Sequence, residues 1–548
     1  MMFKTQHGLL CLLLLILTAC GSGESNVSKG NREGILHWGN AAEPQELDPH
    51  VVTGVPEHNI IMALIEGLVS KNPTTLEPIP AVAESWSVSE DGRVYTFNIR
   101  STARWSNGDP LTAEDFAWSW RRALLPELGN QYAYMYYPIV NAEAFATGEL
   151  QDFSQVGVKV ISPLSLQVTL THPTPFFLQL LDHYSMFPVH RATIEKFGQP
   201  GEANTLWTRA GNFVGNGPFM LEQWDLNKVV KVKKNPQYWD ASTVRLNGIY
   251  FYPTENVTTE ERMFRAEQLH YTYDVPIEKI AVYQREKPQQ IKISPYLGTY
   301  FYRFNTRLKH LSDVRVRKAL AMSIDRKSLV ENVLKAGQLP AYTITPPNTL
   351  GYTASSQLRY DPAAARTLLA EAGYKDGEGF PVTEILYNTH EQHRKVAVAI
   401  QQMWKKELNI NVRIHNQDWK VYLDSESSGN FQISRASWIG DYVDPNSFLD
   451  MWLTGGGNNR TGWSNKTFDY LIQNVAPSAK TKKQRYAAFQ EAESILTDEL
   501  PIIPIYTYVS KHLVHPSVKG LSSNILDTLY FKYMYLEPES EPRSAIKP

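Results

Sequence analysis

Cysteine, long apolar runs and a surplus of one charge are scarce or absent in this sequence. Only 2 of the 548 residues are cysteine, Cys11 and Cys20. Beyond residues 9–17, no apolar run approaches the roughly 20 residues that a membrane-spanning helix needs. Lysine and arginine number 54 against 56 aspartate and glutamate, so the basic excess of a duplex-binding protein is missing. These absences argue against a disulfide framework, a membrane-embedded chain and a nucleic-acid partner.

Catalytic motifs are missing as well. The glycines of residues 457–462 have the spacing of a phosphate-binding loop, but Trp463 stands where the lysine must be. The segment His390-Glu391-Gln392-His393 is one residue shorter than the zinc-protease motif. No Gly-x-Ser-x-Gly nucleophile elbow occurs. The sequence therefore predicts a binding protein without metal or cofactor, and an exported hydrolase is the less favoured alternative.

The N-terminus is typical of an exported protein. Lys4 precedes the apolar run of residues 9–17, and small residues follow it. The run is too short to cross a bilayer and fits a signal peptide, so residues 1–19 are expected to be removed. The end of the run resembles the bacterial lipoprotein cleavage box, which implies that Cys20 becomes the first residue and carries a lipid. The alternative is an ordinary signal cleaved after Ala19, which would leave a free thiol.

Polar segments flank the remaining chain. Residues 20–34 are rich in glycine and serine and are predicted to form a flexible tether. Residues 537–548 are predicted to form a polar tail. A lipid at Cys20 would anchor the protein to a membrane without inserting it. The expected location is therefore the periplasm or the cell surface.

Strands and helices are predicted to alternate between these segments. Apolar residues alternate over residues 94–99 and 166–170, as in half-buried strands. Thr112 and Asp361 are predicted N-caps of two helices. The composition is also rich in tyrosine and tryptophan, which number 29 and 13. These side chains suit contact surfaces, although large α/β proteins also bury many of them.

A β-α-β unit is predicted in the second half of the chain. Residues 382–387 and 410–414 are strand-like and flank a helical stripe over residues 396–404. Ligands gather outside the carboxyl ends of such strands. Asn388 and His393 lie at that position.

Segments spread over nearly the whole mature chain carry a family pattern. They are Leu47-Asp48-Pro49-His50, Ala83-Glu84-Ser85-Trp86, Asp91-Gly92-Arg93-Val94-Tyr95-Thr96-Phe97, Arg104-Trp105-Ser106-Asn107-Gly108, Asn235-Pro236-Gln237-Tyr238-Trp239, Asp313-Val314-Arg315-Val316-Arg317 and Arg435-Ala436-Ser437-Trp438-Ile439-Gly440-Asp441-Tyr442. In this order they resemble the oligopeptide-binding proteins of bacterial ABC importers. That family also includes dipeptide, nickel and murein-peptide binders.

The resemblance implies an α/β fold of the two-lobed periplasmic-binding-protein type, in its large class II form. The implied divisions are lobe I at residues 35–66, 191–297 and 510–536, an extra subdomain at 67–190 and lobe II at 298–509. A peptide would lie extended between the lobes, paired by its backbone, with its side chains in hydrated pockets. The protein is expected to be a monomer.

The resemblance also assigns roles to single residues. Asp441 matches the aspartate that pairs with the α-ammonium of the peptide; the alternative is a surface acid that caps a turn. Trp438 and Trp419 match aromatic positions beside the groove. Tyr132 and Val55 match positions that line it. Plain core packing is the alternative for all four.

Three polar residues match positions near the C-terminal half of the peptide. They are Arg435, His393 and Asn388, and they are expected to anchor a carboxylate for one peptide length. The alternatives are a surface ion pair for Arg435 and a hydrogen-bonded loop histidine for His393.

Three positions depart from the family pattern. Well-known members carry glutamate where this chain has Thr53 and Arg303, and arginine where it has Glu426. Basic peptides are therefore expected to be disfavoured, while an acidic side chain or the carboxylate of a short ligand is expected to pair with Arg303. The alternative is that these positions face water and discriminate little.

The predicted function is capture of short peptides by lobe closure and delivery to the transmembrane subunits of an ABC permease. One alternative is a binder of a murein-type cell-wall peptide. Another is a peptide-sensing surface lipoprotein without a transport role.

Overall fold

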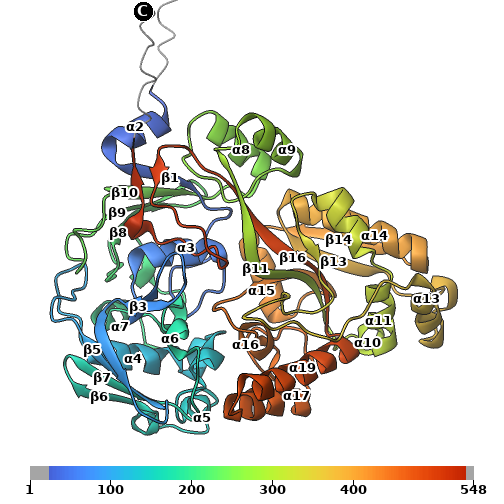
Figure 1. The fold of residues 1–548 in the computed structure, drawn as a ribbon, viewed down its shortest axis with the longest axis horizontal. Coiled ribbons are helices and arrows are strands. Elements are labelled where there is room, and N and C mark those ends of the chain that lie inside the picture. The colour runs from blue at the N-terminus through green and yellow to red at the C-terminus, as the bar shows by residue number, and fades with distance from the viewer. Residues whose placement is uncertain (1–23, 538–548) are drawn as a thin grey trace, which may run out of the picture.

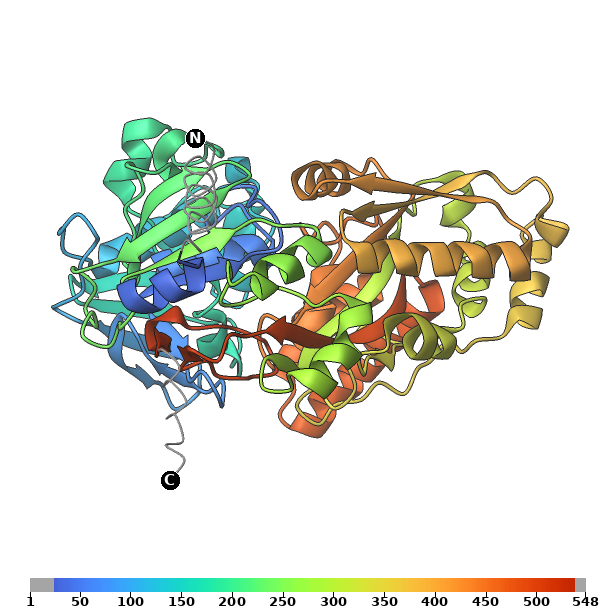
Figure 2. The same ribbon diagram turned by 90° about the horizontal axis from the view of Figure 1, so that it is seen from above.

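Two halves lie side by side in the computed structural model, which describes residues 24–537 (Figure 1). We call the part with two four-stranded sheets the first half, and the part built on a six-stranded sheet the second half. Figure 2 shows the same two halves from above. Helices and strands alternate along most of the chain, as predicted. Within residues 24–537 we find no helix that is long and apolar enough to span a membrane.

The first sheet of the first half has the strand order β1-β10-β9-β8. Its strands are β1 (Ile35–Gly39), β10 (Gly248–Tyr252), β9 (Val229–Lys234) and β8 (Phe219–Asp225). Trp38 of β1 is buried and stacks on Tyr271, with the ring centroids 3.6 Å apart. Helix α3 (Val55–Leu64) packs against β8, so the sheet fixes the position of the helix.

The second sheet of the first half has the order β4-β5-β7-β6. Its strands are β4 (Ala83–Val88), β5 (Val94–Ile99), β7 (Ser165–Thr169) and β6 (Val158–Ser162), and the hairpin of β2 (Val69–Lys71) and β3 (Pro78–Pro80) lies nearby. Phe97 and Ile99 are buried on β5, which confirms the predicted alternation. Helix α4 (Ala113–Ala123) begins after Thr112, whose backbone N–H donates to the Asp115 carboxylate at 2.7 Å, so the predicted helix start is confirmed.

The second half is built on a sheet of order β12-β16-β11-β15-β13-β14. Its strands are β12 (Leu339–Pro340), β16 (Ile502–Leu513), β11 (Ile291–Phe304), β15 (Ile433–Ile439), β13 (Thr383–Asn388) and β14 (Val412–Gln417). β13 and β14 pair in parallel and are joined by α14 (Glu391–Leu408). The predicted β-α-β unit is therefore confirmed.

Helices cover this sheet and pack into the core of the second half. The main ones are α11 (Val314–Met322), α13 (Pro362–Glu371), α14, α15 (Trp419–Ser428) and α19 (Lys482–Glu499). The Asp361 side chain accepts a hydrogen bond from the Ala364 N–H at 2.9 Å, which confirms it as the N-cap of α13. The buried Trp404 of α14 donates its indole N–H to the Leu320 carbonyl of α11 at 2.8 Å.

The two longest strands, β11 and β16, connect the halves (Figure 1). They run antiparallel, and their register shifts between Pro295 and Thr299. Beyond the shift, β16 reaches the first half, where the Leu513 N–H donates to the Thr272 hydroxyl at 2.9 Å. Two strands that pass between two packed halves are a geometry suited to hinge motion.

The predicted flexible tether of residues 20–34 is wrong over most of its length. Helix α2 (Asn26–Glu33) forms there, capped by the Ser25 side chain, which accepts from the Ser28 N–H at 3.1 Å. Val27 is buried, and Gly34 ends the helix in the left-handed region at φ 69°. Composition alone missed these local signals. The predicted signal peptide at residues 1–19, Cys20 and nearly all of the tail at 537–548 lie outside the described residues.

Candidate functional site

A cavity lies between the two halves and is lined from both sides. The first half contributes Thr53, Gly54, Val55, Lys71, Tyr132, Asp182, His183 and Tyr184, among others, and the second half contributes Arg303, Trp419, Glu426, Arg435, Trp438, Asp441, Asn458 and Arg460. Residues Tyr508 to His512 of the connecting strand β16 also line it. Eight of the ten predicted peptide-binding residues therefore share one cavity. The two exceptions are Asn388 and His393.

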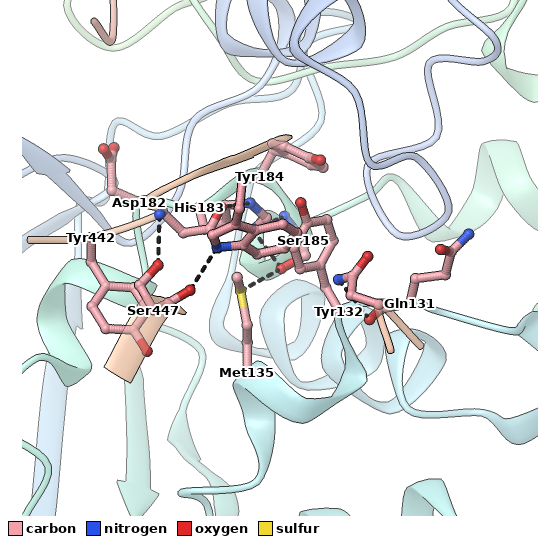
Figure 3. Close-up of polar contacts among 12 residues, drawn as sticks. Gln131, Tyr132, Met135, Asp182, His183, Tyr184, Ser185, Tyr442 and Ser447 are labelled. Carbon is pink, nitrogen blue, oxygen red and sulfur yellow. Dashed lines mark hydrogen bonds and ion pairs between the residues drawn. The ribbon is translucent and has the colours of Figure 1, made fainter. Parts of the chain in front are cut away.

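Asp441 lies two residues after β15, where the chain turns towards the first half. Its backbone N–H donates to the Ser447 hydroxyl at 2.9 Å, which fixes the turn. Its carboxylate lies 3.4 Å from His183 Nε2, across the cavity. Figure 3 shows His183 next to Tyr132 and Tyr184, and the ring centroids of His183 and Tyr132 are 4.5 Å apart. A largely buried acid therefore points into an aromatic recess.

The charges around Asp441 leave room for a cation. Lys71 donates to the Asp441 carbonyl at 3.2 Å, but its charge is matched by Asp182 at 3.4 Å. Among the described residues, the Asp441 carboxylate has no lysine or arginine partner. A desolvated carboxylate without a cation is unfavourable, whereas a bound ammonium would give it a charge-assisted hydrogen bond.

Aromatic side chains wall the cavity next to Asp441. Trp438 donates its indole N–H to the Ser447 carbonyl at 2.6 Å, and its ring centroid lies 6.1 Å from that of Tyr132. Both side chains are buried, so they pack into the interior and line the cavity at once. At these two positions, core packing and contact with the cavity are therefore compatible.

The start of α3 faces the start of α15 across the cavity. Trp419 Nε1 donates to Glu57 Oε1 at 3.3 Å, which joins the two halves. A Cβ on Gly54 would lie 2.9 Å from the Trp419 ring, so the close approach requires glycine there. Thr53 and Val55 flank this contact on the cavity wall.

Glu57 provides a pH-dependent prediction for this contact. Burial raises the pKa of Glu57 to about 7. Folding then favours the protonated acid, so its contribution to stability is full below pH 4.5 and is lost as the pH rises from about 4.5 to 7. The difference between the two pKa values corresponds to a loss of about 3 kcal/mol in the free energy of unfolding. We expect Glu57→Gln to flatten the decline in urea-unfolding stability between pH 5 and 8.

The control for this experiment is Glu84→Gln, because Glu84 is exposed on β4. That variant should keep the pH slope of the wild-type protein. If Glu57→Gln also keeps the wild-type slope, then Glu57 is ionised in the folded protein and the prediction is wrong.

Arg435 projects from β15 into the other end of the cavity. Its guanidinium donates to Asn388 Oδ1 at 3.0 Å and to the Tyr508 hydroxyl at 2.8 Å, and it lies 4.9 Å from the Tyr300 ring centroid. Its Nε has no hydrogen-bond partner among residues 24–537. None of these neighbours is an acid, so the site holds a positive charge that a ligand carboxylate can neutralise.

Asn388 and His393 lie behind Arg435 rather than on the cavity wall. Asn388 ends β13 and supports the Arg435 guanidinium through its side-chain oxygen. His393 is buried on α14, with its ring centroid 5.5 Å from that of Tyr300. Burial and the nearby Arg435 charge hold the pKa of His393 well below its usual value. In this conformation Asn388 can position Arg435 directly, and His393 reaches Arg435 only through the Tyr300 ring that both contact.

Arg303 lies next to an acid of the chain itself. Its guanidinium lies 3.6 Å from the Glu426 carboxylate, and Arg460 donates to the same carboxylate at 2.9 Å. The two departures from the family pattern, at positions 303 and 426, therefore lie next to each other as a cation and an anion. One carboxylate here serves two guanidinium groups.

Arg460 lies within residues 457–462, the segment whose glycines have phosphate-loop spacing. It also donates to the Gln131 side chain of the first half. A Cβ on Gly457 would lie 2.6 Å from Gln131 Cα. Gly457 therefore allows close approach of the two halves.

Lys71, Asp182, His183 and Arg460 are cavity residues that the sequence analysis did not single out. They come from a short strand and from loops, and they meet only through the fold. No local spacing marks them, so nothing in the sequence alone identified them.

The short histidine motif has a structural role. His390 Nε2 lies 3.3 Å from the Asp274 carboxylate, and Lys511 contacts the same carboxylate at 2.7 Å. Over residues 24–537 there is no group of three or more His, Cys, Asp or Glu placed to hold a metal ion.

Known proteins resemble this chain over most of its length. Residues 77–460 match the family model described as "Bacterial extracellular solute-binding proteins, family 5 Middle". The periplasmic oligopeptide-binding protein OppA of Salmonella typhimurium is 38% identical over 510 residues, which covers 91% of each chain. The structure of the murein tripeptide binding protein MppA of Escherichia coli has a TM-score of 0.87 at 36% identity and covers 92% of this chain and 98% of MppA.

A second MppA structure identifies the conformation of this chain. The unliganded open form of MppA, at the same 36% identity, has a TM-score of 0.61 and covers 92% of this chain and 97% of MppA. Because one relative matches well in one structure and poorly in its open form, the halves described above are not in the open arrangement. The predicted α/β, two-lobed binding-protein fold is confirmed by these similarities.

Proposed function

Because the chain belongs to the bacterial extracellular solute-binding proteins of family 5, we propose that it captures short peptides between its halves and delivers them to an ABC permease. The relatives described above are named as binding proteins for oligopeptides and for a murein tripeptide. The function needs no catalysis, and a partner ATPase would supply the energy for transport.

The single observation that carries this proposal is the unmatched pair of opposite charges in one cavity. Asp441 lacks a lysine or arginine partner among the described residues, and Arg435 has only neutral hydrogen-bond partners. A peptide with free termini supplies an ammonium for the first and a carboxylate for the second. Both charged ends would then be satisfied, and the peptide direction would be fixed.

The remaining predicted residues are assigned to the walls of the peptide site. Trp438, Trp419, Tyr132 and Val55 would contact peptide side chains or backbone, and Thr53 would leave its pocket uncharged. Asn388 and His393 would act through Arg435. Closure of the halves around a ligand is the general behaviour of periplasmic binding proteins.

The chain organisation follows the same proposal. Residues 1–19 would be removed on export and Cys20 would carry the lipid anchor. Lobe I would comprise 35–66, 191–297 and 510–536, with the extra subdomain at 67–190 and lobe II at 298–509, in a monomer. The register shift in the strands that connect the halves supports a hinge there.

A murein-type cell-wall peptide is a second candidate ligand. The observation in its favour is Arg303, a buried cation whose Nε and one terminal nitrogen have no hydrogen-bond partner in the described chain, residues 24–537. A ligand with more than one carboxylate would satisfy it. Titration of a cell-wall tripeptide against trialanine measures which is preferred.

The test of the proposed function is calorimetric titration of trialanine and tetra-alanine into the protein lacking residues 1–20. We expect saturable binding, with a smaller radius of gyration in solution scattering when ligand is present. Absence of both heat and compaction for unmodified peptides of two to six residues would contradict peptide capture. Growth on peptides as nutrients, with and without the gene for this chain, separates uptake from sensing.

A further inference from the structure

Most charged residues that line the cavity form ion pairs with each other, but some of the charges have no partner of opposite sign. Lys71 pairs with Asp182 at 3.4 Å, and Lys511 pairs with Asp274 at 2.7 Å. His512 lies 2.8 Å from Asp527. Burial lowers the pKa of His512, but the Asp527 carboxylate outweighs it and the net shift is upward. These pairs need nothing from a ligand.

Beyond Asp441 and Arg435, three charged residues of the cavity remain, and their charges do not cancel. Arg303, Arg460 and Glu426 together carry two positive charges and one negative charge. Arg460 donates a hydrogen bond to the Glu426 carboxylate, whereas the Arg303 guanidinium lies 3.6 Å from the same oxygen, too far for a hydrogen bond. Ser434 donates to the other Glu426 oxygen at 2.7 Å. Arg460 and Ser434 each donate to one Glu426 oxygen, whereas Arg303 stays beyond hydrogen-bond distance of the carboxylate.

Arg303 is buried and faces the cavity with unpaired donors. Its side chain is 5% exposed, and within the described part of the chain neither its Nε nor one of its terminal nitrogens has a hydrogen-bond partner. Burial lowers the pKa of Arg303, and the neighbouring Arg460 and Arg435 charges add to this, while Glu426 opposes it. A buried guanidinium that lacks acceptors is unfavourable unless a ligand supplies them.

We propose that Arg303 and Arg460 form a receptor for an acidic side chain, so that the ligands of this cavity are peptides carrying an aspartate or glutamate between free termini. This inference rests on the proposed function. The termini are already matched by Asp441 and Arg435, which leaves an internal carboxylate for Arg303. Arg460 also contacts Gln131 of the first half, so a carboxylate bound here would strengthen closure.

The experiment compares matched peptides that differ by one charge. Tripeptides of alanine with glutamate at one position are titrated against the same peptides with glutamine. Because a hydrogen bond to a charged group is worth about 1.5–3 kcal/mol, we expect glutamate to bind about tenfold tighter or more at one position. Glutamate and glutamine peptides with a C-terminal amide should show the same affinity ratio. The amide removes only the terminal carboxylate, which would pair with Arg435, and leaves the side-chain carboxylate for Arg303.

Two variants change the net positive charge of Arg303, Arg460 and Glu426 in opposite directions. Arg303→Gln removes the excess charge and should bring the glutamate-to-glutamine affinity ratio to about one. Glu426→Gln raises the excess to two and should increase the ratio above that of the wild-type protein. A purely structural role would weaken both peptides equally and leave the ratio unchanged.

The outcomes separate this inference from the proposed function. If trialanine binds but glutamate and glutamine peptides bind equally at every position, the acidic receptor is wrong and peptide capture stands. If no unmodified peptide binds, peptide capture itself is wrong. The wild-type comparison needs no variant, so poor folding of Arg303→Gln would not prevent a decision.

Discussion

Asparagine in place of Asp441 will weaken binding of a peptide with a free N-terminus by roughly thirtyfold or more. Truncating one partner of a buried charge pair costs about 2–5 kcal/mol, and about 1.4 kcal/mol is a factor of ten. Within residues 24–537 no lysine or arginine pairs with the Asp441 carboxylate, whose ion-pair contact is His183 Nε2 at 3.4 Å, so a peptide ammonium would be its cation. Calorimetric titration of trialanine into both proteins measures the difference.

The controls locate this effect at the ammonium group. An N-acetylated peptide lacks the charge, so it should bind the wild-type protein and Asp441→Asn with nearly equal affinity. Asp424→Asn on the exposed face of α15 should bind trialanine like the wild-type protein. Equal affinity of Asp441→Asn and wild type for trialanine would rule out the ammonium role of Asp441.

Methionine in place of Arg122 will destabilise the first half by about 3–5 kcal/mol, because it leaves a buried carboxylate unpaired. Arg122 on α4 donates to both Asp48 oxygens, at 3.0 and 2.6 Å, and the two side chains are 0% and 1% exposed. His50 Nδ1 accepts a hydrogen bond from the Arg122 guanidinium at 3.0 Å in the same cluster. Urea unfolding of the wild-type protein and the variant measures the loss in free energy of unfolding.

Two further variants distinguish this buried pair from an ordinary one. Arg191→Met breaks an exposed pair with Glu195 and should cost about 1 kcal/mol or less. Asp48→Leu combined with Arg122→Met should recover part of the lost stability, since no unpaired charge remains. A loss in Arg122→Met no larger than in Arg191→Met would contradict the expected burial penalty.

The same pair predicts sensitivity to acid. Burial raises the pKa of Asp48, but Arg122 more than offsets this and holds it below its usual value. Its stabilising contribution is therefore present above the pKa of unfolded aspartate, near 4, and is lost as the pH falls through the lower folded value. Arg122→Met should lack this contribution.

Local patterns predicted local structure well. The alternation on β5 and the caps at Thr112 and Asp361 were correct because each depends on a few neighbouring residues. The tether prediction is wrong because a polar composition does not exclude a helix that Ser25 caps and Gly34 ends. Burial of Val27 against the rest of the first half is a tertiary effect that the segment itself does not reveal.

The site was predictable where it resembles a family pattern and hidden where it depends on contacts between the halves. Asp441 and Arg435 lie on one strand and its extension, so a single segment contained both. The competition of Arg303 and Arg460 for Glu426 joins a strand, a helix and a loop that are distant in sequence. A departure from the pattern at each position did not reveal that two of the departures pair with each other.

Native mass spectrometry of the protein lacking residues 1–20 tests peptide capture most directly. The protein is purified without added ligand and then denatured to release what it carries. We predict a series of short peptides with free N-termini, enriched in aspartate or glutamate. Release of a non-peptide species, or protein that carries no ligand and binds no peptide afterwards, would contradict peptide capture.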